Sequence, residues 1–556
     1  MPYDELTQVL LKKRGIETEE EAEKFLNPSY DTQLVDPLSI KNMPEAAARL
    51  AKAILSGERI AVWTDYDCDG VPAAVIFHDF LKKAGANFEN YIPHRHLEGY
   101  GVNSSGIEKL AKAGATLLLT ADVGITDAEA IARARALGMD TIVTDHHLPA
   151  QAGLPPGIVV DPNAHADETA AFKSWCGAGL AWKLVCATLA VEPTLREKVP
   201  IGWEKWLLDM AALATIADMV SLTGDNRLIA KYGLLVMRKS PRIGLQKLCR
   251  LMRVDQSKIT EDDVGFMIAP RVNAASRMGD ALEAFKLFTT TDETEATEIA
   301  QKLEKLNRQR KAEAGAITRA VRERLAGRTD LRSVIALGDP SWRPALLGLV
   351  ANGIAEEYQR PVFLWGREGN NSIKGSCRAG NSTHVIELMT AAQGAFVEFG
   401  GHAFSGGFTV RDDEVFFLED RLVEARSALA ESVLEEVGQP DAEISALQAD
   451  LRFLAKLERF APFGQDNEKP LLRFHNAEIA SAERFGKSKE HVKLKIIRDE
   501  FSAPIEGIAF FAKGALARVA DTLLAGGHAD ILAHLERDQF SRRGYPRLRL
   551  VSLTLV

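Results

Sequence analysis

Short apolar runs and amphipathic helical stretches alternate along the first third of the chain. Four of the runs have the length of a strand, and each ends in an aspartate: residues 59–65, 116–122, 140–145 and 157–161. Helical patterns such as residues 71–84 and 127–137 separate them, and this alternation is typical of βαβ units around a parallel sheet. Because ligands of such sheets bind beyond the carboxyl ends of the strands, we expect the four aspartates to converge on one cleft.

The pattern changes twice further along the chain. Helical periodicity dominates residues 179–326 and ends in a charged stretch at 292–325, which predicts a long connecting helix. Strand patterns return, around a helix at 345–357, and predict a second α/β domain; they are residues 333–337, 361–365, 372–376 and 406–410. A helical bridge at 414–436 follows, and after Pro470 short alternating strands at 491–497, 505–510 and 548–555 predict a small β-barrel.

These patterns predict a multidomain α/β protein, in keeping with a length of 556 residues. The expected parts are a helical segment at 1–45, a parallel-sheet domain at 46–225, a helical connector at 226–328, a second α/β domain at 329–412, a helical bridge at 413–440 and an OB-like β-barrel at 441–556.

The composition is that of a soluble globular protein, with 46% hydrophobic and 26% charged residues. No apolar run approaches the roughly 18 residues of a membrane span, and the five cysteines form no CxxC pair. We therefore expect a cytoplasmic protein with reduced thiols. The net charge of −9 argues against indiscriminate binding to polyanions, but residues 470–556 hold 14 Lys and Arg against 10 Asp and Glu. A mildly basic C-terminal part is compatible with a nucleic-acid partner.

The candidate chemistry lies where the first strands end. Residues 64–70 read TDYDCDG, and strand alternation places Asp65 and Asp67 on one side, as half of a divalent-metal site. Alternatively, Asp69 and Gly70 only start the next helix. Asp122, in TADVGITD, and the histidines of TDHHLP favour the metal site, and carboxylates with imidazole suit Mn²⁺ or Mg²⁺. Cys68 falls on the opposite face, where we expect it to pack.

Taken in order, these motifs resemble a known superfamily. DYDCDG at 65–70, DVG at 122–124 and DHH at 145–147 resemble the first three motifs of the DHH phosphoesterases. PRVNAASRMGD at 270–280, GSCR at 375–378, GGH at 400–402 and PFG at 462–464 resemble RecJ-type single-stranded-DNA-specific exonucleases. The resemblance implies a DHH domain that faces a DHH-associated domain across a groove, with an OB-fold attached.

The resemblance also implies a site with two divalent cations, Mn²⁺ or Mg²⁺. The metal ligands that it implies are Asp65, Asp67, Asp122, His146 and Asp218. Asp218 fits the family pattern better than Asp209. Asp122 would bridge the two ions, and His147 would contact the scissile phosphate or the attacking water, so that Asp67, Asp122 and His147 are the catalytic candidates.

Cations should hold the substrate opposite these metals. Arg95 and Arg277 look like the arginines of the family that recognise a 5′ phosphate. The remaining substrate-binding residues that the resemblance implies are Ser376, Arg378, Gly400, Gly401 and His402.

The function implied is a metal-dependent hydrolase that degrades single-stranded DNA from the 5′ end (5′ to 3′) in DNA recombination and repair. Its partner would be single-stranded DNA with a 5′ end, with a helicase or single-strand-binding protein as candidate protein partners, no membrane, and a monomeric state. Two alternatives stay open: a phosphodiesterase of short oligoribonucleotides or cyclic dinucleotides, and a non-catalytic replication scaffold. The β-rich C-terminal segment favours a long substrate, and the full set of ligand positions disfavours a scaffold.

Two further positions carry expectations. Trp63 stands two residues before Asp65, and alternation predicts that it lies near the first metal, where relatives of the family have glycine or histidine. The alternative is that Trp63 only packs, which is the commoner role of a tryptophan. Gly177 and Gly179 flank Ala178 without the third glycine of a dinucleotide site, so we expect close helix packing there.

Overall fold

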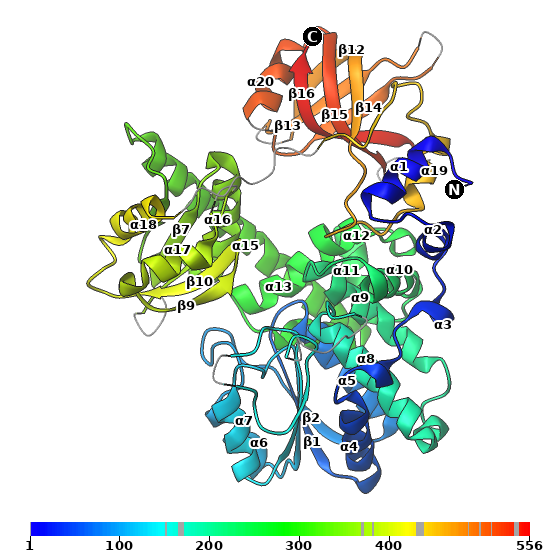
Figure 1. Ribbon diagram of the computed structural model, residues 1–556, viewed down its shortest axis with the longest axis vertical. Helices are drawn as coiled ribbons and strands as arrows, with labels where there is room; N and C mark the ends of the chain where they lie inside the picture. Colours follow the sequence, from blue (N-terminus) through cyan, green and yellow to red (C-terminus); the bar gives the residue numbers. More distant parts are fainter. Residues whose placement is uncertain are drawn as a thin grey trace.

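Three β-sheets organise the molecule (Figure 1). The computed structural model describes residues 2–150, 153–164, 172–367, 372–380, 383–429, 439–486, 489–499, 502–512, 514–538 and 544–556. A parallel sheet lies at the bottom of Figure 1, a mixed sheet at the left and a barrel at the top. The expected multidomain α/β architecture with a C-terminal barrel is confirmed.

The first sheet has the order β2-β1-β3-β4-β5, and all its strands are parallel. Its strands are β1 (Arg59–Thr64), β2 (Asn87–Tyr91), β3 (Leu117–Ala121), β4 (Asp140–Thr144) and β5 (Ile158–Val160). Four of the five were predicted. The edge strand β2 was missed because its sequence, NFENY, is too polar for the apolar run that marked the others.

Helices cover both faces of this sheet. α4 (Met43–Ser56), α5 (Gly70–Ala84) and α8 (Gly177–Val191) share one hydrophobic core with alternate residues of β1 and β3. α6 (Ser104–Lys112) and α7 (Ala128–Ala136) share a second core on the other face. The first core continues through α9 (Leu208–Ala217), at the end of the expected parallel-sheet domain, into helices of the expected connector: α10 (Gly224–Met237), α11 (Ile243–Met252), α13 (Ala269–Met278) and α14 (Leu282–Thr289).

Trp63 belongs to the second core. Its side chain has no exposed surface and stacks on Tyr91, with ring centroids 4.2 Å apart. A Cβ on Gly106 of α6 would lie 2.3 Å from the indole, so this ring fills the space between β1 and α6. The prediction that Trp63 lies near the first metal rather than in the helix layer is therefore wrong.

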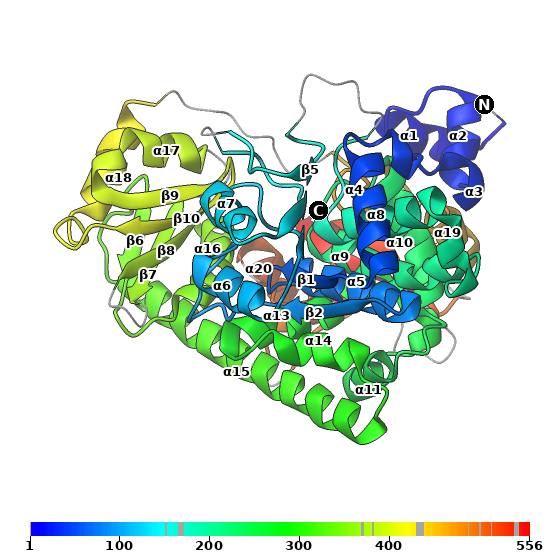
Figure 2. The same ribbon diagram turned by 90° about the horizontal axis from the view of Figure 1, so that it is seen from below.

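The long helix α15 (Glu293–Ala326) links the first two sheets. Its 34 residues span about 50 Å, and it runs along the lower edge of Figure 2, beneath α13 and α14. The predicted connecting helix is confirmed to within one residue at each end. Within the described residues, no helix combines the length and the hydropathy that a membrane crossing needs.

The second sheet has the order β6-β7-β8-β10-β9. Its strands are β6 (Ile335–Gly338), β7 (Val362–Arg367), β8 (Ile373–Arg378), β9 (Phe396–His402) and β10 (Ser405–Val410). α16 (Pro344–Tyr358) covers one face, and α17 (Val385–Ala391) and α18 (Leu418–Ser427) cover the other. β9 was not predicted, since glycines interrupt its pattern. α18 forms part of the expected bridge, and residues 430–438 lie outside the described residues.

The C-terminal strands close into a five-stranded barrel. They are β12 (Leu472–Phe485), β13 (His491–Ile496), β14 (Ile505–Ala509), β15 (Gly527–Arg537) and β16 (Pro546–Leu555). β12 pairs with both β13 and β15, which completes the ring of hydrogen-bonded strands. The short β11 (Ala442–Glu443) adds to β12, and α19 (Leu451–Glu458) and α20 (Gly514–Thr522) flank the barrel.

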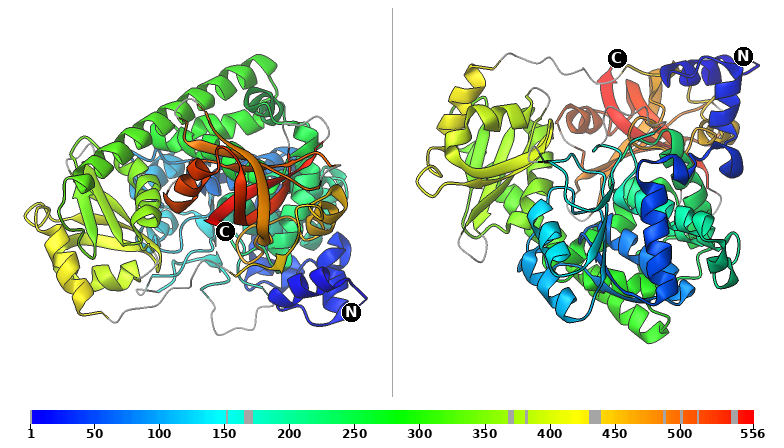
Figure 3. Two further views of the ribbon diagram at one scale, coloured as in Figure 1. Left: turned by 90° about the horizontal axis from the view of Figure 1, so that it is seen from above. Right: turned by 60° about the horizontal axis from the view of Figure 1, so that its bottom comes forward.

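The first helices of the chain pack with this barrel. α1 (Glu5–Lys13) and α2 (Glu19–Leu26) place Leu10, Leu11 and Leu26 in the same core as Phe460 and the barrel strands. Ion pairs of 2.8 Å from Lys13 to Asp441 and of 2.9 Å from Lys456 to Asp4 join the same parts. Segments more than 400 residues apart in the sequence thus form one structural unit (Figures 1 and 3).

Candidate metal centre

Acidic side chains gather where β1, β3 and β4 end. β3 lies between β1 and β4, so the residues that follow these strands meet at one edge of the sheet. Carboxylate oxygens of Asp65, Asp67 and Asp122 lie within 4.8 Å of one another. Asp65 and Asp67 therefore lie close together, as expected, although β1 ends at Thr64 and strand alternation does not extend to them.

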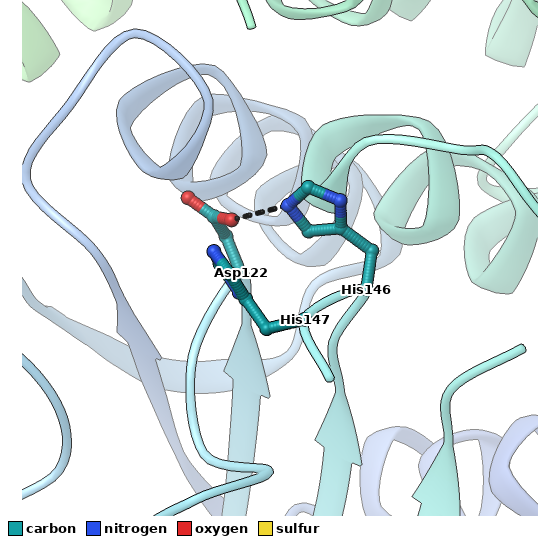
Figure 4. A group of neighbouring side chains, drawn as sticks. All are labelled: Asp122, His146 and His147. Carbon is teal, nitrogen blue, oxygen red and sulfur yellow. Dashed lines mark hydrogen bonds and ion pairs between the residues drawn. The ribbon is translucent and has the colours of Figure 1, made fainter. Parts of the chain in front are cut away.

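Two histidine-containing groups adjoin these carboxylates. One joins Asp122 with His146 and His147, and the other joins His146 with Asp69 and Asp218. Nε2 of His146 lies 3.2 Å from Oδ1 of Asp122, and Figure 4 shows the two side chains pointing toward each other. Asp122 and His146 each belong to two of the three potential ligand groups, so these groups adjoin one another, and a site for two neighbouring cations can be formed.

The loop after β1 is fixed by its own carboxylates. Oδ1 of Asp67 accepts hydrogen bonds from the amides of Asp69 and Gly70, at 2.7 and 3.1 Å. A Cβ at Gly70 would lie 2.3 Å from the carbonyl oxygen of Asp65, so only glycine allows this tight approach. The loop both starts α5 and presents carboxylates to the cluster. The metal-site and helix-start interpretations of the motif are therefore both correct.

Asp69 ties this loop to α8. Its side chain is 1% exposed, and its two oxygens accept the amides of Gly177 and Ala178 at 2.6 and 2.7 Å. These amides belong to the first turn of α8, where no intrahelical acceptor exists. The sequence assigned Asp69 only to the start of α5, because nothing in it indicates that the partner is a helix a hundred residues later.

Asp145 orients the two histidines. Its Oδ1 accepts from the amides of His146 and His147, at 2.8 and 3.2 Å, and lies 2.8 Å from Nδ1 of His147. Its Oδ2 accepts the amide of Ile125 at 2.9 Å. Asp145 therefore fixes the backbone of both histidines and the ring of His147 through these hydrogen bonds.

Asp161, which follows β5, is linked to the histidines only through Asn163. Its Oδ1 accepts the amide of Asn163 at 2.7 Å, and the Asn163 side chain donates to the carbonyl of His146 at 2.5 Å. Of the four aspartates expected to converge on one cleft, Asp65 and Asp122 enter the potential ligand groups of the described residues, and Asp145 and Asp161 support them.

The electrostatics of the cluster suit cations. Burial, and then the neighbouring carboxylates, raise the pKa of Asp65, Asp122 and Asp218 well above the usual value. Oδ1 of Asp65 is buried and has no hydrogen-bond partner among the described residues. An unpaired buried carboxylate is costly unless a cation compensates it, and oxygen ligands with one imidazole suit Mn²⁺ or Mg²⁺. The donor set therefore fits the expected metals.

The two histidines differ in protonation. Burial lowers the pKa of His146, which favours the neutral imidazole that a metal ligand requires. For His147, burial acts in the same direction, but the hydrogen bond and charge of Asp145 outweigh it and raise the pKa to about 9. In the metal-free cluster His147 is therefore a cation and a donor at neutral pH.

Asp218 and Asp209 have different surroundings in the structure. Oδ2 of Asp218 lies 3.9 Å from Nε2 of His146. Oδ2 of Asp209 instead accepts from Ser240 and from Nε of Arg242, at 2.7 and 2.8 Å. Asp209 is thus engaged in a buried ion pair, and Asp218 is the one that lies beside the cluster.

Two arginines border the cluster. Arg95 lies over the ring of Tyr66, with its guanidinium carbon 4.8 Å from the ring centroid. Nη1 of Arg277, at the end of α13, donates to the carbonyl of Ala345 in α16 at 2.7 Å. Burial, followed by the charge of Arg95, lowers the pKa of Arg277 to about 10, while Asp67 opposes the shift. The two predicted 5′-phosphate residues are therefore near each other and near the carboxylates.

The other predicted substrate residues lie on the second sheet. Ser376 and Arg378 belong to β8, Gly400 and Gly401 belong to β9, and β10 pairs with both strands. Nη1 of Arg378 donates to its neighbouring carbonyl at 2.7 Å. Gly401 has φ 142°, and a Cβ there would lie 2.3 Å from the carbonyl oxygen of Ser405. The side chain of His402 lies outside the described residues.

Family models match three parts of the chain. The DHH family N-terminal domain matches residues 59–215, the DHHA1 domain residues 331–435 and the RecJ OB domain residues 440–552. The first two contain the two sheets, and the third covers the barrel up to residue 552, within its last strand.

Individual proteins match over most of the chain. The single-stranded-DNA-specific exonuclease RecJ of Bacillus subtilis is 32% identical over 98% of this chain and 67% of its own length. RecJ of Thermus thermophilus is 34% identical over 81% of this chain and 64% of its own length. This chain thus spans about two thirds of these relatives. The crystal structure of the Thermus thermophilus RecJ in complex with Mn²⁺ superposes with a TM-score of 0.80 and 27% identity, over 99% of this chain and 76% of that one.

Proposed function

The chain belongs to the RecJ family of single-stranded-DNA-specific exonucleases, and we propose that it hydrolyses single-stranded DNA from the 5′ end in a reaction that depends on two divalent cations. The observation that carries the proposal is the cluster at the ends of β1, β3 and β4, in which Asp122 and His146 are shared between ligand groups. A pair of cations at this cluster suits phosphodiester hydrolysis, since negative charge develops on the attacking and the leaving oxygen on opposite sides of the phosphorus.

The proposed metal ligands are those that the family resemblance implies. Asp65 would hold one cation, Asp67, His146 and Asp218 would hold the other, and Asp122 would be shared; all five residues occur in the potential ligand groups of the described residues. When bound, the two cations would stabilise the attacking and leaving oxygens of an in-line displacement. The close hydrogen bonds of Asp67 and Asp69 to backbone amides keep the carboxylates in place before any cation binds.

The remaining residues handle the substrate. His147, kept protonated by Asp145, donates to an oxygen of the scissile phosphate. Arg95 and Arg277 hold the 5′-terminal phosphate, which sets the direction of degradation. The second sheet binds the adjoining backbone through Ser376, Arg378 and His402, where Gly400 and Gly401 permit close approach.

The alternative substrates fit less well. Short oligoribonucleotides or cyclic dinucleotides would leave the barrel without a role, and barrels of this kind bind single strands. A scaffold would not need the ligand groups at the strand ends. We further propose a monomer that acts in recombination and repair with a helicase or a single-strand-binding protein. All five cysteines are free, as in proteins of the reducing cytoplasm.

The test uses end-labelled DNA and RNA, single- and double-stranded, with a 5′-phosphate or a 5′-hydroxyl and with Mn²⁺, Mg²⁺ or EDTA. We expect cleavage of single-stranded DNA that releases the 5′ label first and that requires a divalent cation. Release from the 3′ end would contradict the polarity. Activity confined to di- or trinucleotides would favour the small-substrate alternative.

A further inference from the structure

The loop after β1 is tied to α13 through a backbone amide. Within the loop, the amides of Asp69 and Gly70 donate to Asp67. The amide of Cys68 donates instead to Oδ1 of Asn273 in α13, at 3.0 Å. Because a partly buried amide needs an acceptor, Asn273 fixes where the metal-binding loop lies against α13.

The same face of α13 carries one of the proposed 5′-phosphate residues. Arg277 follows Asn273 by four residues, which is about one turn and about 6 Å along the helix axis. The helix is itself anchored, since Nε of Arg271 donates to Glu304 of α15 at 2.7 Å. α13 therefore holds the metal-binding loop and Arg277 at a fixed separation.

Two further contacts join the segment 94–96 to both of these elements. Nε2 of His96 lies 3.2 Å from the carbonyl oxygen of Arg277. The guanidinium of Arg95, the preceding residue, lies over the ring of Tyr66, which belongs to the loop after β1. Three elements that contact one another in pairs cannot shift independently. The distance from the two arginines to the metal cluster is therefore set by a closed triangle of contacts.

This distance decides which linkage of a strand can be cut. When Arg95 and Arg277 hold the terminal phosphate, the linkage that reaches the cations is the one whose distance along the strand matches the separation of the two sites. Another linkage reaches the cations only when the terminal phosphate has left the arginines. A fixed separation therefore selects one linkage, since reaction requires close and correct placement of the reacting groups.

We propose that Asn273 and His96 are positioning residues that set the length of the product released at each cut. They act through the metal-binding loop and through Arg277, by keeping the 5′-phosphate site at one distance from the metal cluster. This inference rests on the proposed function and adds the residues that determine the product. The competing account is that both side chains only stabilise the fold.

The test uses a single strand of twenty nucleotides with a labelled 5′-phosphate, cut with Mn²⁺ for short times, and a denaturing gel that separates the labelled products by length. The unmodified protein should release labelled product of one length. Asn273→Leu has a side chain of similar size but no acceptor. It should raise the share of labelled products of other lengths by about tenfold, the order of effect of one lost hydrogen bond to a buried amide.

A second measurement separates positioning from damage to the metal site. The affinity of Asn273→Leu for Mn²⁺, measured by titration calorimetry, should not change, because the bonds of Asp67 and Asp69 to backbone amides still hold the loop. The preference for 5′-phosphorylated over 5′-hydroxyl DNA should fall, since the two sites no longer act on the strand together.

Matched variants test the second contact and the effect of stability. His96→Leu should give mixed lengths as well, whereas His96→Gln, which keeps a donor, should retain the single product. Asn42→Ala is the control, because it removes a hydrogen bond of 2.7 Å to the carbonyl of Val159 in β5 and leaves the triangle intact. It should lower the melting temperature and retain the single product.

A single product length from folded Asn273→Leu and His96→Leu proteins would overturn the proposal, and so would mixed lengths from the unmodified protein or from Asn42→Ala. A lower Mn²⁺ affinity of Asn273→Leu would overturn it too, because Asn273 would then act on the metal site alone. If the unmodified protein cuts no single strand, the proposed function itself is contradicted.

Discussion

Gly177 and Asp122 approach so closely that a Cβ on Gly177 would lie 2.4 Å from the Cβ of Asp122. The first turn of α8 is therefore packed directly against the residue proposed to contact both cations. The expected close packing at this glycine is confirmed, and its partner is the metal cluster. Two amides of the same turn donate hydrogen bonds to Asp69. α8 therefore fixes both Asp122 and Asp69.

Gly177→Ala should displace Asp122 and lower the affinity for Mn²⁺ by about 10- to 100-fold, as for other changes to residues that orient ligands. Titration calorimetry with Mn²⁺ measures this. Gly179→Ala is the control in the same helix, because its Cβ would meet only ordinary contacts, the nearest at 3.5 Å. Equal affinities of the two variants would contradict the proposed role of the contact.

Asp122→Ala should abolish cleavage, because this carboxylate belongs to both ligand groups. In the metal-free protein the same change should raise the melting temperature, since it removes one of several buried carboxylates that repel one another. An activity within about tenfold of the unmodified protein would contradict the assignment. His147→Ala should cost less, since it removes a positioning donor and leaves the shared ligand in place.

The pH dependence of stability should differ with and without metal. A carboxyl whose pKa is higher in the folded than in the unfolded state stabilises the fold only while protonated, and this contribution is lost as pH rises above about 4. Asp65, Asp122 and Asp218 are of this kind, through burial and mutual repulsion. The protonated His147, with a pKa of about 9, acts in the same direction.

We therefore expect the metal-free melting temperature to fall from about pH 5 to about pH 8, and Mn²⁺ to raise it more at the higher pH, since cations bind the ionised carboxylates. Thermal unfolding with Mn²⁺ and with EDTA measures both effects. In Asp122→Asn the metal-free dependence on pH should be shallower. A Mn²⁺ effect of the same size at both pH values would refute this account.

Trp63→His should destabilise the fold by about 2 to 4 kcal/mol, since it leaves a cavity between β1 and α6. Because the indole lies in the helix layer, the Mn²⁺ concentration for half-maximal rate should not change. Denaturant unfolding measures the loss of stability, and a titration of the cleavage rate with Mn²⁺ measures the metal requirement. A lower metal requirement would mean that position 63 reaches the metal site after all.

Arg95→Ala should reduce the preference for 5′-phosphorylated over 5′-hydroxyl DNA, because a guanidinium forms charge-assisted bonds with phosphate. Arg277→Ala should do the same but should also lower stability, since Nη1 of Arg277 joins α13 to α16. Rates on the two DNA ends, with thermal unfolding, separate these effects. An equal slowing on both ends by Arg95→Ala would assign that residue to the backbone or the fold.

The parallel sheet and its strand-end carboxylates could be predicted because burial on both faces leaves a clear apolar run before each aspartate. Trp63 was misplaced because alternation was extended to Asp65, whereas β1 ends at Thr64 and the chain turns there. The supporting roles of Asp69 and Asp145 could not be predicted either. Asp69 depends on two amides of α8, and Asp145 depends on the amide of Ile125 as well as on those of the two residues that follow it. Backbone amides carry no sequence signature.

The shared core of α1, α2 and the barrel has a consequence for how the chain is made. During synthesis, Leu26 leaves the ribosome about 430 residues before Phe460, its partner in that core. At roughly 5 to 20 residues per second this delay is about 20 to 90 s. Throughout that time the apolar side chains of the first two helices lack their final neighbours. The first two helices therefore stay without their final core until the last strands have been synthesised.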